Sequence, residues 1–258
     1  MTIHFIGAGP GSADLLTLRA KKIISESDIC MYAGSLVSKE ILRFCKSSVK
    51  KINTSHMHLD EIINEFLDAD KENLDVARLH SGDLSIWSAL GEQIRRLKEK
   101  KIKYTITPGV TSFSAASAVL ENEFTLPHVA QTVILTRTEG SATPMPNNEK
   151  LEEMAKIGAT LVIHLSILKL KKIINILMPF YGSDCPIAIL YRISWPEEKI
   201  FRGTLNNIVD QVSPDIKRSA LIVVGRALFN ESFKDSSLYS KNYETQFRKL
   251  KKIRINKL

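Results

Sequence analysis

The sequence lacks the features that mark several common protein classes. Its 258 residues include three cysteines, Cys30, Cys45 and Cys185, which lie far apart and form no CxxC pair. This pattern predicts neither a disulfide framework nor a zinc site. The chain also has no HExxH motif and no GxxxxGK phosphate loop, so zinc peptidases and P-loop NTPases are not favoured. We therefore predict no metal site.

Long apolar runs are absent as well. No stretch approaches the roughly 18 apolar residues that a membrane-spanning helix needs. The first residues enter a strand-like run without a basic leader or a cleavage signal. With 44% hydrophobic and 25% charged residues, the composition is that of an ordinary globular protein. We expect a cytoplasmic protein that does not bind a membrane.

Positive charge is present but unevenly distributed. The formal net charge is +8, and residues 241–258 alone hold seven basic side chains against one acidic side chain. The rest of the chain is close to neutral. We interpret residues 241–258 as a solvated basic tail, with a nucleic-acid or membrane-surface arm as the alternative. The charge gives little support for a nucleic-acid partner, and we predict none.

Strand-like and helical patterns alternate along the chain, which predicts an α/β fold. In the first half we expect strands at residues 3–6, 28–32, 74–79 and 104–107, with helices around residues 15–24, 88–100 and 112–120. In the second half we expect strands at residues 133–136, 160–165, 187–192, 199–202 and 221–224, with helices at residues 149–157, 169–177 and 205–212. This order predicts a mostly parallel sheet followed by a second sheet.

The second sheet should be mixed. The tetrapeptide Trp195-Pro196-Glu197-Glu198 is a tight connection between two consecutive strands, which is typical of a hairpin. We therefore predict two α/β domains, residues 1–122 and 123–240, with a ligand cleft between them and the basic tail after them. No internal repeat or low-complexity segment is visible.

Three glycine-containing turns follow strands of the first half. The first, Gly7-Ala8-Gly9-Pro10-Gly11, departs from the dinucleotide fingerprint GxGxxG because Ser12 stands where the third glycine belongs. A phosphate-binding turn, a plain tight turn and another ligand loop all stay open for it. Ser81-Gly82-Asp83 and Pro108-Gly109-Val110-Thr111-Ser112 each follow a later strand. Turns at the carboxyl ends of parallel strands line one crevice, so the three together predict a ligand site.

Several motifs occur in an order that resembles the tetrapyrrole methylase family of the cobalamin pathway. The resemblance covers roughly residues 2–226 and is carried by Gly7–Gly11, Tyr32–Val37, His80–Asp83, Pro108–Phe113, Gln131–Arg137, Gly158–Leu161 and Ser194–Glu198. Within that family the chain is most similar to the enzymes that methylate C11 of precorrin-4 or cobalt-precorrin-4. Two positions depart from the family pattern, since Leu84 replaces a usual proline and Ser88 a common glycine.

The resemblance implies a two-domain homodimer that binds S-adenosylmethionine in the cleft between the domains. Carried over by position, the cofactor-binding residues are Pro10, Ser81, Gly82, Asp83, Ile86, Thr111, Ser112, Leu165, Arg192, Ile193 and Ala220. The implied reaction is methyl transfer to a ring carbon of a precorrin. Asp83 would orient the cofactor or, as the candidate catalytic residue, accept a proton late in the reaction.

The implied substrate carries acetate and propionate groups, so we look for arginines that bind carboxylates. Arg137 and Arg192 follow or end predicted strands and are the candidates, while a structural ion pair is the alternative for each. Two other functions stay open. One is another tetrapyrrole methylase, for uroporphyrinogen-III or a different precorrin, and the other is a non-catalytic tetrapyrrole-binding regulator. The sequence does not say whether the substrate contains cobalt.

Overall fold

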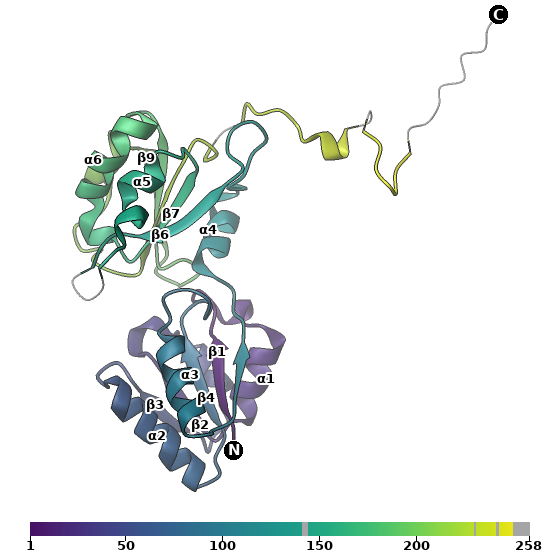
Figure 1. Cartoon of the computed structure of the whole chain (residues 1–258), viewed down its shortest axis with the longest axis vertical. Helices are drawn as coiled ribbons and strands as arrows, with labels where there is room; N and C mark the ends of the chain where they lie inside the picture. The colour runs from purple at the N-terminus through teal and green to yellow at the C-terminus, as the bar shows by residue number, and fades with distance from the viewer. Residues whose placement is uncertain (141–143, 230, 241–242, 250–258) are drawn as a thin grey trace, which may run out of the picture.

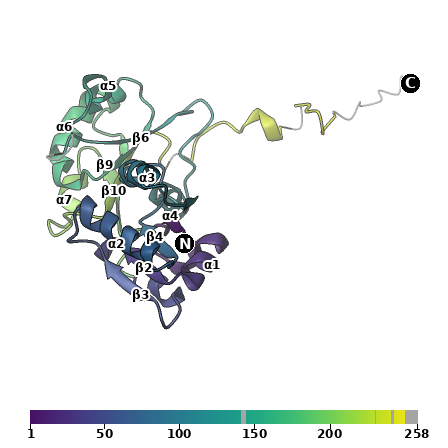
Figure 2. The same cartoon turned by 60° about the horizontal axis from the view of Figure 1, so that its bottom comes forward.

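The computed structural model of the chain contains two five-stranded sheets, one above the other in the view of Figure 1. It describes residues 1–140, 144–229, 231–240 and 243–249. After the second sheet, residues 231–240 and 243–249 lead away from both sheets (Figures 1 and 2). The basic tail predicted for residues 241–258 lies outside the described residues at positions 241–242 and 250–258.

The first sheet is fully parallel, as expected for the first half of the chain. Its strands lie in the order β3-β2-β4-β1-β5. Their bounds are β1 (Ile3–Gly7), β2 (Ile29–Tyr32), β3 (Lys50–Asn53), β4 (Val76–His80) and β5 (Tyr104–Thr107). The edge strand β3 was not predicted, because its lysines and asparagine leave it without an apolar run.

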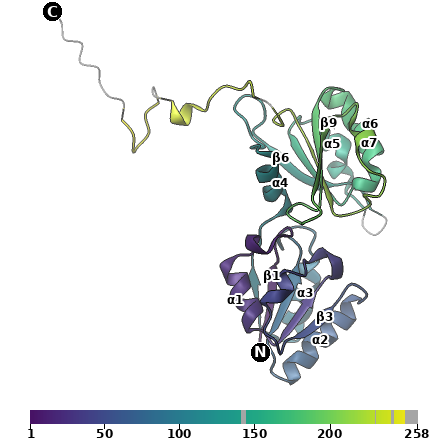
Figure 3. The same ribbon diagram turned by 180° about the vertical axis from the view of Figure 1, so that it is seen from behind.

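Helices cover both faces of this sheet (Figure 3). On one face, α1 (Leu18–Glu26) packs Ala20 and Ile24 against the strands. On the other lie α2 (Leu59–Lys71) and α3 (Leu90–Glu99). Helix α2 was not predicted, although its buried Ile62, Ile63 and Phe66 have helical spacing. Short 3-10 helices lie at Ala13–Leu15, Gly34–Leu36, Ile41–Phe44, Asn147–Glu149, Ile167–Lys169 and Ser237–Tyr239.

The second sheet is mixed, which confirms the expectation. Its strands lie in the order β6-β7-β10-β8-β9. Their bounds are β6 (Val133–Arg137), β7 (Thr160–His164), β8 (Pro186–Tyr191), β9 (Lys199–Thr204) and β10 (Ala220–Val224). β6 and β7 pair in parallel, and the other neighbours are antiparallel. β8 and β9 form the hairpin predicted around the Trp195-Pro196-Glu197-Glu198 connection.

The helices of the second half also lie on two faces. One apolar cluster holds α5 (Leu151–Ala155), α6 (Leu170–Tyr181) and α7 (Ile208–Gln211) against the sheet. The opposite face packs against α4 (Ser112–Leu120), whose Ala115, Ala116 and Leu120 meet Val162 and Leu190. The division predicted at residue 122 stays a prediction, and the packing of α4 favours a boundary closer to its first residue.

The three glycine-containing turns meet at one edge of the first sheet. They follow β4, β1 and β5, which are neighbours in the strand order. The backbones of Gly9 and Gly82 exchange two hydrogen bonds, with N–O distances of 3.0 and 2.7 Å. A Cβ atom on Gly109 would lie 2.7 Å from the carbonyl carbon of Gly7 and closer still to the carbonyl oxygen of Gly82. The turns therefore pack backbone against backbone, with no room for side chains.

This packing predicts opposite effects for two glycine-to-alanine changes. Gly109→Ala should lower the free energy of unfolding by more than about 2 kcal/mol, because the new methyl group overlaps backbone that is held by the strands. Gly91→Ala is the matched control, since a Cβ atom there has no neighbour within 4 Å. That change should be neutral or stabilise α3 by up to about 1 kcal/mol. Urea unfolding measures both, and equal effects would contradict the close packing.

Candidate functional site

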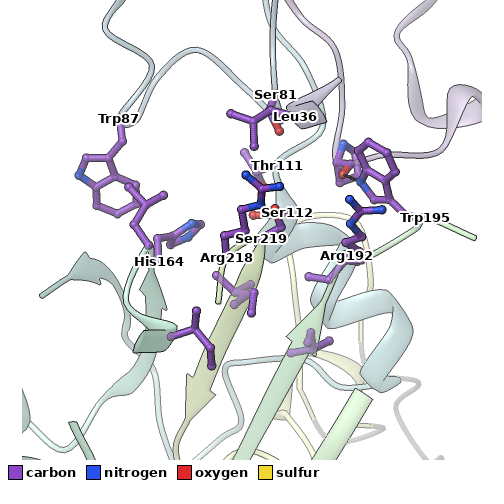
Figure 4. A pocket seen from close by; sticks show the side chains of 18 of the residues that line it. Leu36, Ser81, Trp87, Thr111, Ser112, His164, Arg192, Trp195, Arg218 and Ser219 are labelled. Carbon is purple, nitrogen blue, oxygen red and sulfur yellow. Dashed lines mark hydrogen bonds between the residues drawn. The ribbon is translucent and has the colours of Figure 1, made fainter. Parts of the chain in front are cut away.

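A cavity of about 390 Å³ lies between the two sheets (Figure 4). The first sheet contributes the turns after β1, β4 and β5, and the second contributes the ends of β7 and β8 and the start of β10. All the residues that the resemblance assigned to the cofactor line this cavity, namely Pro10, Ser81, Gly82, Asp83, Ile86, Thr111, Ser112, Leu165, Arg192, Ile193 and Ala220. Residues more than 200 positions apart are thus brought to one site.

The second sheet reaches the cavity because of its strand directions. β7 and β8 both run antiparallel to β10, so their carboxyl ends and the start of β10 lie at the same edge. The backbone there is bent sharply, with positive φ at Leu165, Arg192, Ser194 and Ser219. The amide of Arg192 donates a 2.9 Å hydrogen bond to the carbonyl of Ser219. Non-glycine residues in this region of φ cost energy and cluster at functional sites.

Asp83 joins two of the turns. Its Oδ1 accepts a hydrogen bond from the amide of Ser85 and its Oδ2 accepts one from the amide of Gly109, each 2.8 Å long. Partial burial raises the pKa of this carboxyl, but the hydrogen bonds from Ser85, Gly109 and the Leu84 amide outweigh it and hold the pKa below its usual value. Asp83 is thus an ionised, doubly engaged carboxylate, which suits positioning better than proton transfer.

Trp195 connects the two halves of the site. Its indole Nε1 donates a 2.8 Å hydrogen bond to the carbonyl of Pro10, and the amide of Ser12 donates one of 3.0 Å to the hydroxyl of Ser194. The indole lies so close to Gly11 that a Cβ atom there would overlap the ring. The hairpin turn of the second sheet therefore holds the glycine turn after β1 in place.

Arginines on the second sheet give the cavity positive charge. Arg192, which was predicted, donates to Glu197 across 3.1 Å and lies over the ring of Trp195, with its guanidinium carbon 5.0 Å from the ring centre. Lys217 and Arg218 also line the cavity, and Figure 4 labels Arg218 and Arg192 among the side chains around it. Asp83 is the one acidic residue among the described residues of the lining. The cavity is thus suited to ligands that carry negative groups.

Arg137 lies elsewhere. Its guanidinium donates hydrogen bonds to the carbonyls of Thr138 and Pro144, both 3.4 Å long, and it does not line this cavity in the part of the chain that is described. Of the two predicted carboxylate-binding arginines, the structure brings only Arg192 to the cofactor residues. The role of Arg137 stays a prediction.

Sequence reasoning missed several residues of the lining. Ser35 and Leu36 belong to a segment that carried the resemblance, so a signal for them was present. Lys217 and Arg218 had no signal, because they precede a strand whose direction was not predicted. Trp87 and His164 were also missed. They come from different halves of the chain and both line the cavity, and their ring centroids lie 4.8 Å apart (Figure 4).

His164 is a largely buried imidazole in the lining of the first cavity. Its Nε2 is buried and has no hydrogen-bond partner among the described residues. Burial lowers the pKa of this imidazole to about 4, so the ring is neutral near pH 7. His164 therefore contributes a ring surface but no positive charge to the lining.

The described residues hold neither of two other kinds of site. They contain no group of three or more His, Cys, Asp or Glu side chains that could hold a metal ion. No described helix is long and apolar enough to cross a membrane.

Comparison with known proteins gives consistent matches over nearly the whole chain. The sequence model of the family Tetrapyrrole (Corrin/Porphyrin) Methylases matches residues 2–209. A Sinorhizobium sp protein named precorrin-4 C(11)-methyltransferase is 52% identical and aligns with 96% of this chain and 98% of its own length. A Methanocaldococcus jannaschii protein named cobalt-precorrin-4 C(11)-methyltransferase is 44% identical and aligns with 96% of each chain.

A solved structure matches as well. The X-ray structure of cobalt precorrin-4 methyltransferase, a cobalamin biosynthetic enzyme, superimposes with a TM-score of 0.85 at 38% sequence identity. The match covers 88% of this chain and 95% of that one. The two-sheet fold that encloses the cavity is thus similar to the fold of that enzyme.

The position of Asp83 predicts the effect of Asp83→Asn. An asparagine can accept one of the two backbone hydrogen bonds but places an NH₂ group against the other amide. Allowing for partial exposure, the free energy of unfolding should fall by about 1–2 kcal/mol. Asp215→Asn removes a charge from an exposed turn and is the control. Equal stability of the two variants in urea unfolding would show that Asp83 does not hold the turns together.

The lowered pKa of His164 predicts a pH dependence of stability. The unfolded chain binds a proton below its ordinary pKa of about 6.5, whereas the folded ring stays neutral until about pH 4. Stability is therefore lost as the pH falls from about 6.5 toward 4, by roughly 1–2 kcal/mol between pH 7 and pH 5. His164→Gln should remove that share of the acid dependence. An unchanged slope in this variant would refute the assignment.

Proposed function

Because the chain belongs to the tetrapyrrole methylase family, we propose that it uses S-adenosylmethionine to methylate C11 of precorrin-4 or cobalt-precorrin-4, a step of cobalamin biosynthesis. The observation that carries this proposal is that every residue expected to bind the cofactor lines one cavity between the two sheets. The named relatives extend over nearly the whole chain, which supports the same reaction.

The lining has the chemistry that an adenosyl group with an amino-acid tail needs. Ile86, Leu165 and Ile193 offer apolar surface, while Thr111 and Ser112 offer hydroxyls and the first amides of α4. The ring of His164, which packs against Trp87, adds further flat surface to the lining. We propose that these residues, with Pro10, Ser81, Gly82, Asp83 and Ala220, hold S-adenosylmethionine.

Bound S-adenosylmethionine supplies a methyl group activated by the positive charge of its sulfonium sulfur. The task of the protein is to place that group against the ring carbon and to exclude water. The close backbone packing of the three turns and the hydrogen bond from Trp195 to Pro10 give the site the rigidity that this placement needs. Transfer between a cation and a neutral or weakly anionic carbon is favoured in a dry cleft and needs no nucleophilic side chain. We assign Asp83 a positioning role.

On the substrate side, guanidinium and ammonium groups suit the acetate and propionate arms of a precorrin. Arg192 and Arg218 are the proposed contacts next to the cofactor residues. Arg137 would reach only a part of the macrocycle that extends beyond the cavity. From the resemblance we further expect a homodimer in the cytoplasm.

The two alternative functions are less well supported. A non-catalytic regulator would not need the complete set of cofactor residues around one cavity, and the departures Leu84 and Ser88 leave that set intact. A uroporphyrinogen-III methylase is opposed by the Trp195-Pro196-Glu197-Glu198 turn, whose sequence resembles the C11 enzymes and whose Trp195 lines the cavity.

Methyl transfer can be tested directly. The protein should add one labelled methyl group from S-adenosylmethionine to precorrin-4 or to cobalt-precorrin-4, and mass spectrometry and NMR should place it at C11. Comparison of the two macrocycles establishes whether cobalt is required, and uroporphyrinogen-III is the control that should stay unmethylated. Methylation of uroporphyrinogen-III instead, or cofactor binding without transfer to any of the three, would overturn the proposal.

A further inference from the structure

A second cavity of about 370 Å³ lies beside the first, under the loop that joins β4 to α3. The two cavities share Leu36, Ser81, Ile86 and Trp87 as lining residues. The two cavities thus adjoin along these four residues. Ser81 and Ile86, which are assigned to the cofactor, line only its border with the first cavity. The other lining residues, among them Arg78, His80 and Gln93, have no role in the function proposed so far.

Arg78 contributes a buried positive charge to the second cavity. It lies on the central strand β4, with a side chain only 5% exposed. Its Nη1 donates to the hydroxyl of Thr54 over 2.8 Å and its Nε donates to Oε1 of Gln93 over 3.4 Å. Both acceptors are neutral, and the described residues place no carboxylate within ion-pair distance.

A buried arginine without a counterion is unusual. Burial lowers the pKa of Arg78 to about 10, so the guanidinium is still charged near neutral pH. Buried charges are costly unless they are paired, and structures keep them where they have a function. The guanidinium has five N–H donors, of which the two hydrogen bonds to Thr54 and Gln93 leave others unused.

His80 lies two residues further along β4 and on the same face of the sheet. It is 8% exposed and also lines the second cavity. Burial and the charge of Arg78 lower its pKa to about 3, so this imidazole is neutral. Its Nε2 has no hydrogen-bond partner among the described residues. The cavity lining therefore includes a buried cation and a neutral imidazole two residues apart on the same strand.

The walls of the second cavity limit what it can take. Leu59, Ile62 and Trp87 are apolar, so a methylene stem fits against them while its charged end meets Arg78. Glu92 also lines the cavity but is exposed to solvent, where its charge is screened. A short chain that ends in a carboxylate matches this arrangement.

We infer that the second cavity receives a carboxylate-bearing side arm of the macrocycle, with Arg78 as the residue that binds the carboxylate. This inference rests on the proposed function, because it supposes that a polyacid ring occupies the adjoining space. The cofactor also carries a carboxylate, for which Lys217 in the lining of the first cavity is the candidate, because Arg192 and Arg218 are proposed for the substrate.

The test is the affinity of Arg78→Met for the macrocycle. Methionine is of similar length and removes the charge, so the dissociation constant for precorrin-4 or cobalt-precorrin-4, titrated with S-adenosylhomocysteine present to prevent turnover, should rise at least tenfold. The affinity for S-adenosylhomocysteine alone should not change. In steady-state assays KM for the macrocycle should rise with kcat changed less than threefold. Arg95→Met, on the exposed surface of α3, removes the same charge and should change none of these values.

A second variant keeps the inference testable if Arg78→Met does not fold. Gln93→Glu is isosteric and places a carboxylate against Arg78 inside the cavity, which supplies the missing counterion. Its melting temperature reflects both the new ion pair with Arg78 and the loss of the 2.9 Å hydrogen bond that Gln93 Nε2 donates to the carbonyl of Ala89, and its affinity for the macrocycle should fall as in Arg78→Met. Circular dichroism and thermal unfolding establish that each variant is folded.

The outcomes separate this inference from the proposed function. A folded Arg78→Met variant with unchanged macrocycle affinity would overturn the inference and leave the methyltransferase proposal standing. A variant that loses S-adenosylhomocysteine instead would show that the cavity holds the carboxylate of the cofactor. Macrocycle binding that depends on Arg78 in a protein without methyl transfer would support the inference and refute the proposed function.

Discussion

The site depends on the contact of three backbone turns at the edge of the first sheet. Gly7, Gly82 and Gly109 meet without side chains between them, and the carboxylate of Asp83 accepts an amide hydrogen bond from the turn after β5. Because β4, β1 and β5 are neighbours, their turns converge only if the parallel order of the sheet is kept. The closeness of these turns leaves their polar backbone groups and the residues beside them facing one cavity.

The second sheet completes the cavity through one hairpin. The indole of Trp195 donates a hydrogen bond to the carbonyl of Pro10 and packs against Gly11. Trp195 therefore fixes the position of the turn after β1. The same hairpin carries Arg192 and Glu197, whose ion pair lies beside the indole. The same short segment thus positions the glycine turn after β1 and places a positive charge in the cavity. A change in the hairpin would alter both together.

Much of this arrangement could be predicted from the sequence, and the failures have physical causes. Glycine turns after apolar runs indicate the carboxyl ends of parallel strands, and the order of motifs identified the lining residues from both halves. Edge strand β3 was missed because an exposed strand needs no apolar run. Lys217 and Arg218 were missed because antiparallel pairing of β10, a long-range property, brings them to the cavity. Arg78 stands in a strand that was predicted, but its lack of a counterion is visible only in three dimensions.

The titratable groups around the two cavities divide into two kinds. His80 and His164 are buried, and their lowered pKa values keep both rings neutral well below pH 7. They therefore add no charge to the cavity linings. The positive charge comes from guanidinium groups, at Arg192 and Arg218 in the first cavity and at Arg78 in the second. Since Arg78 titrates only near pH 10, the charge that this part of the fold offers to a polyacid stays constant across the neutral range. In the proposed function, recognition of the acid arms would thus be separate from proton transfer, which agrees with a reaction in which the protein binds and orients.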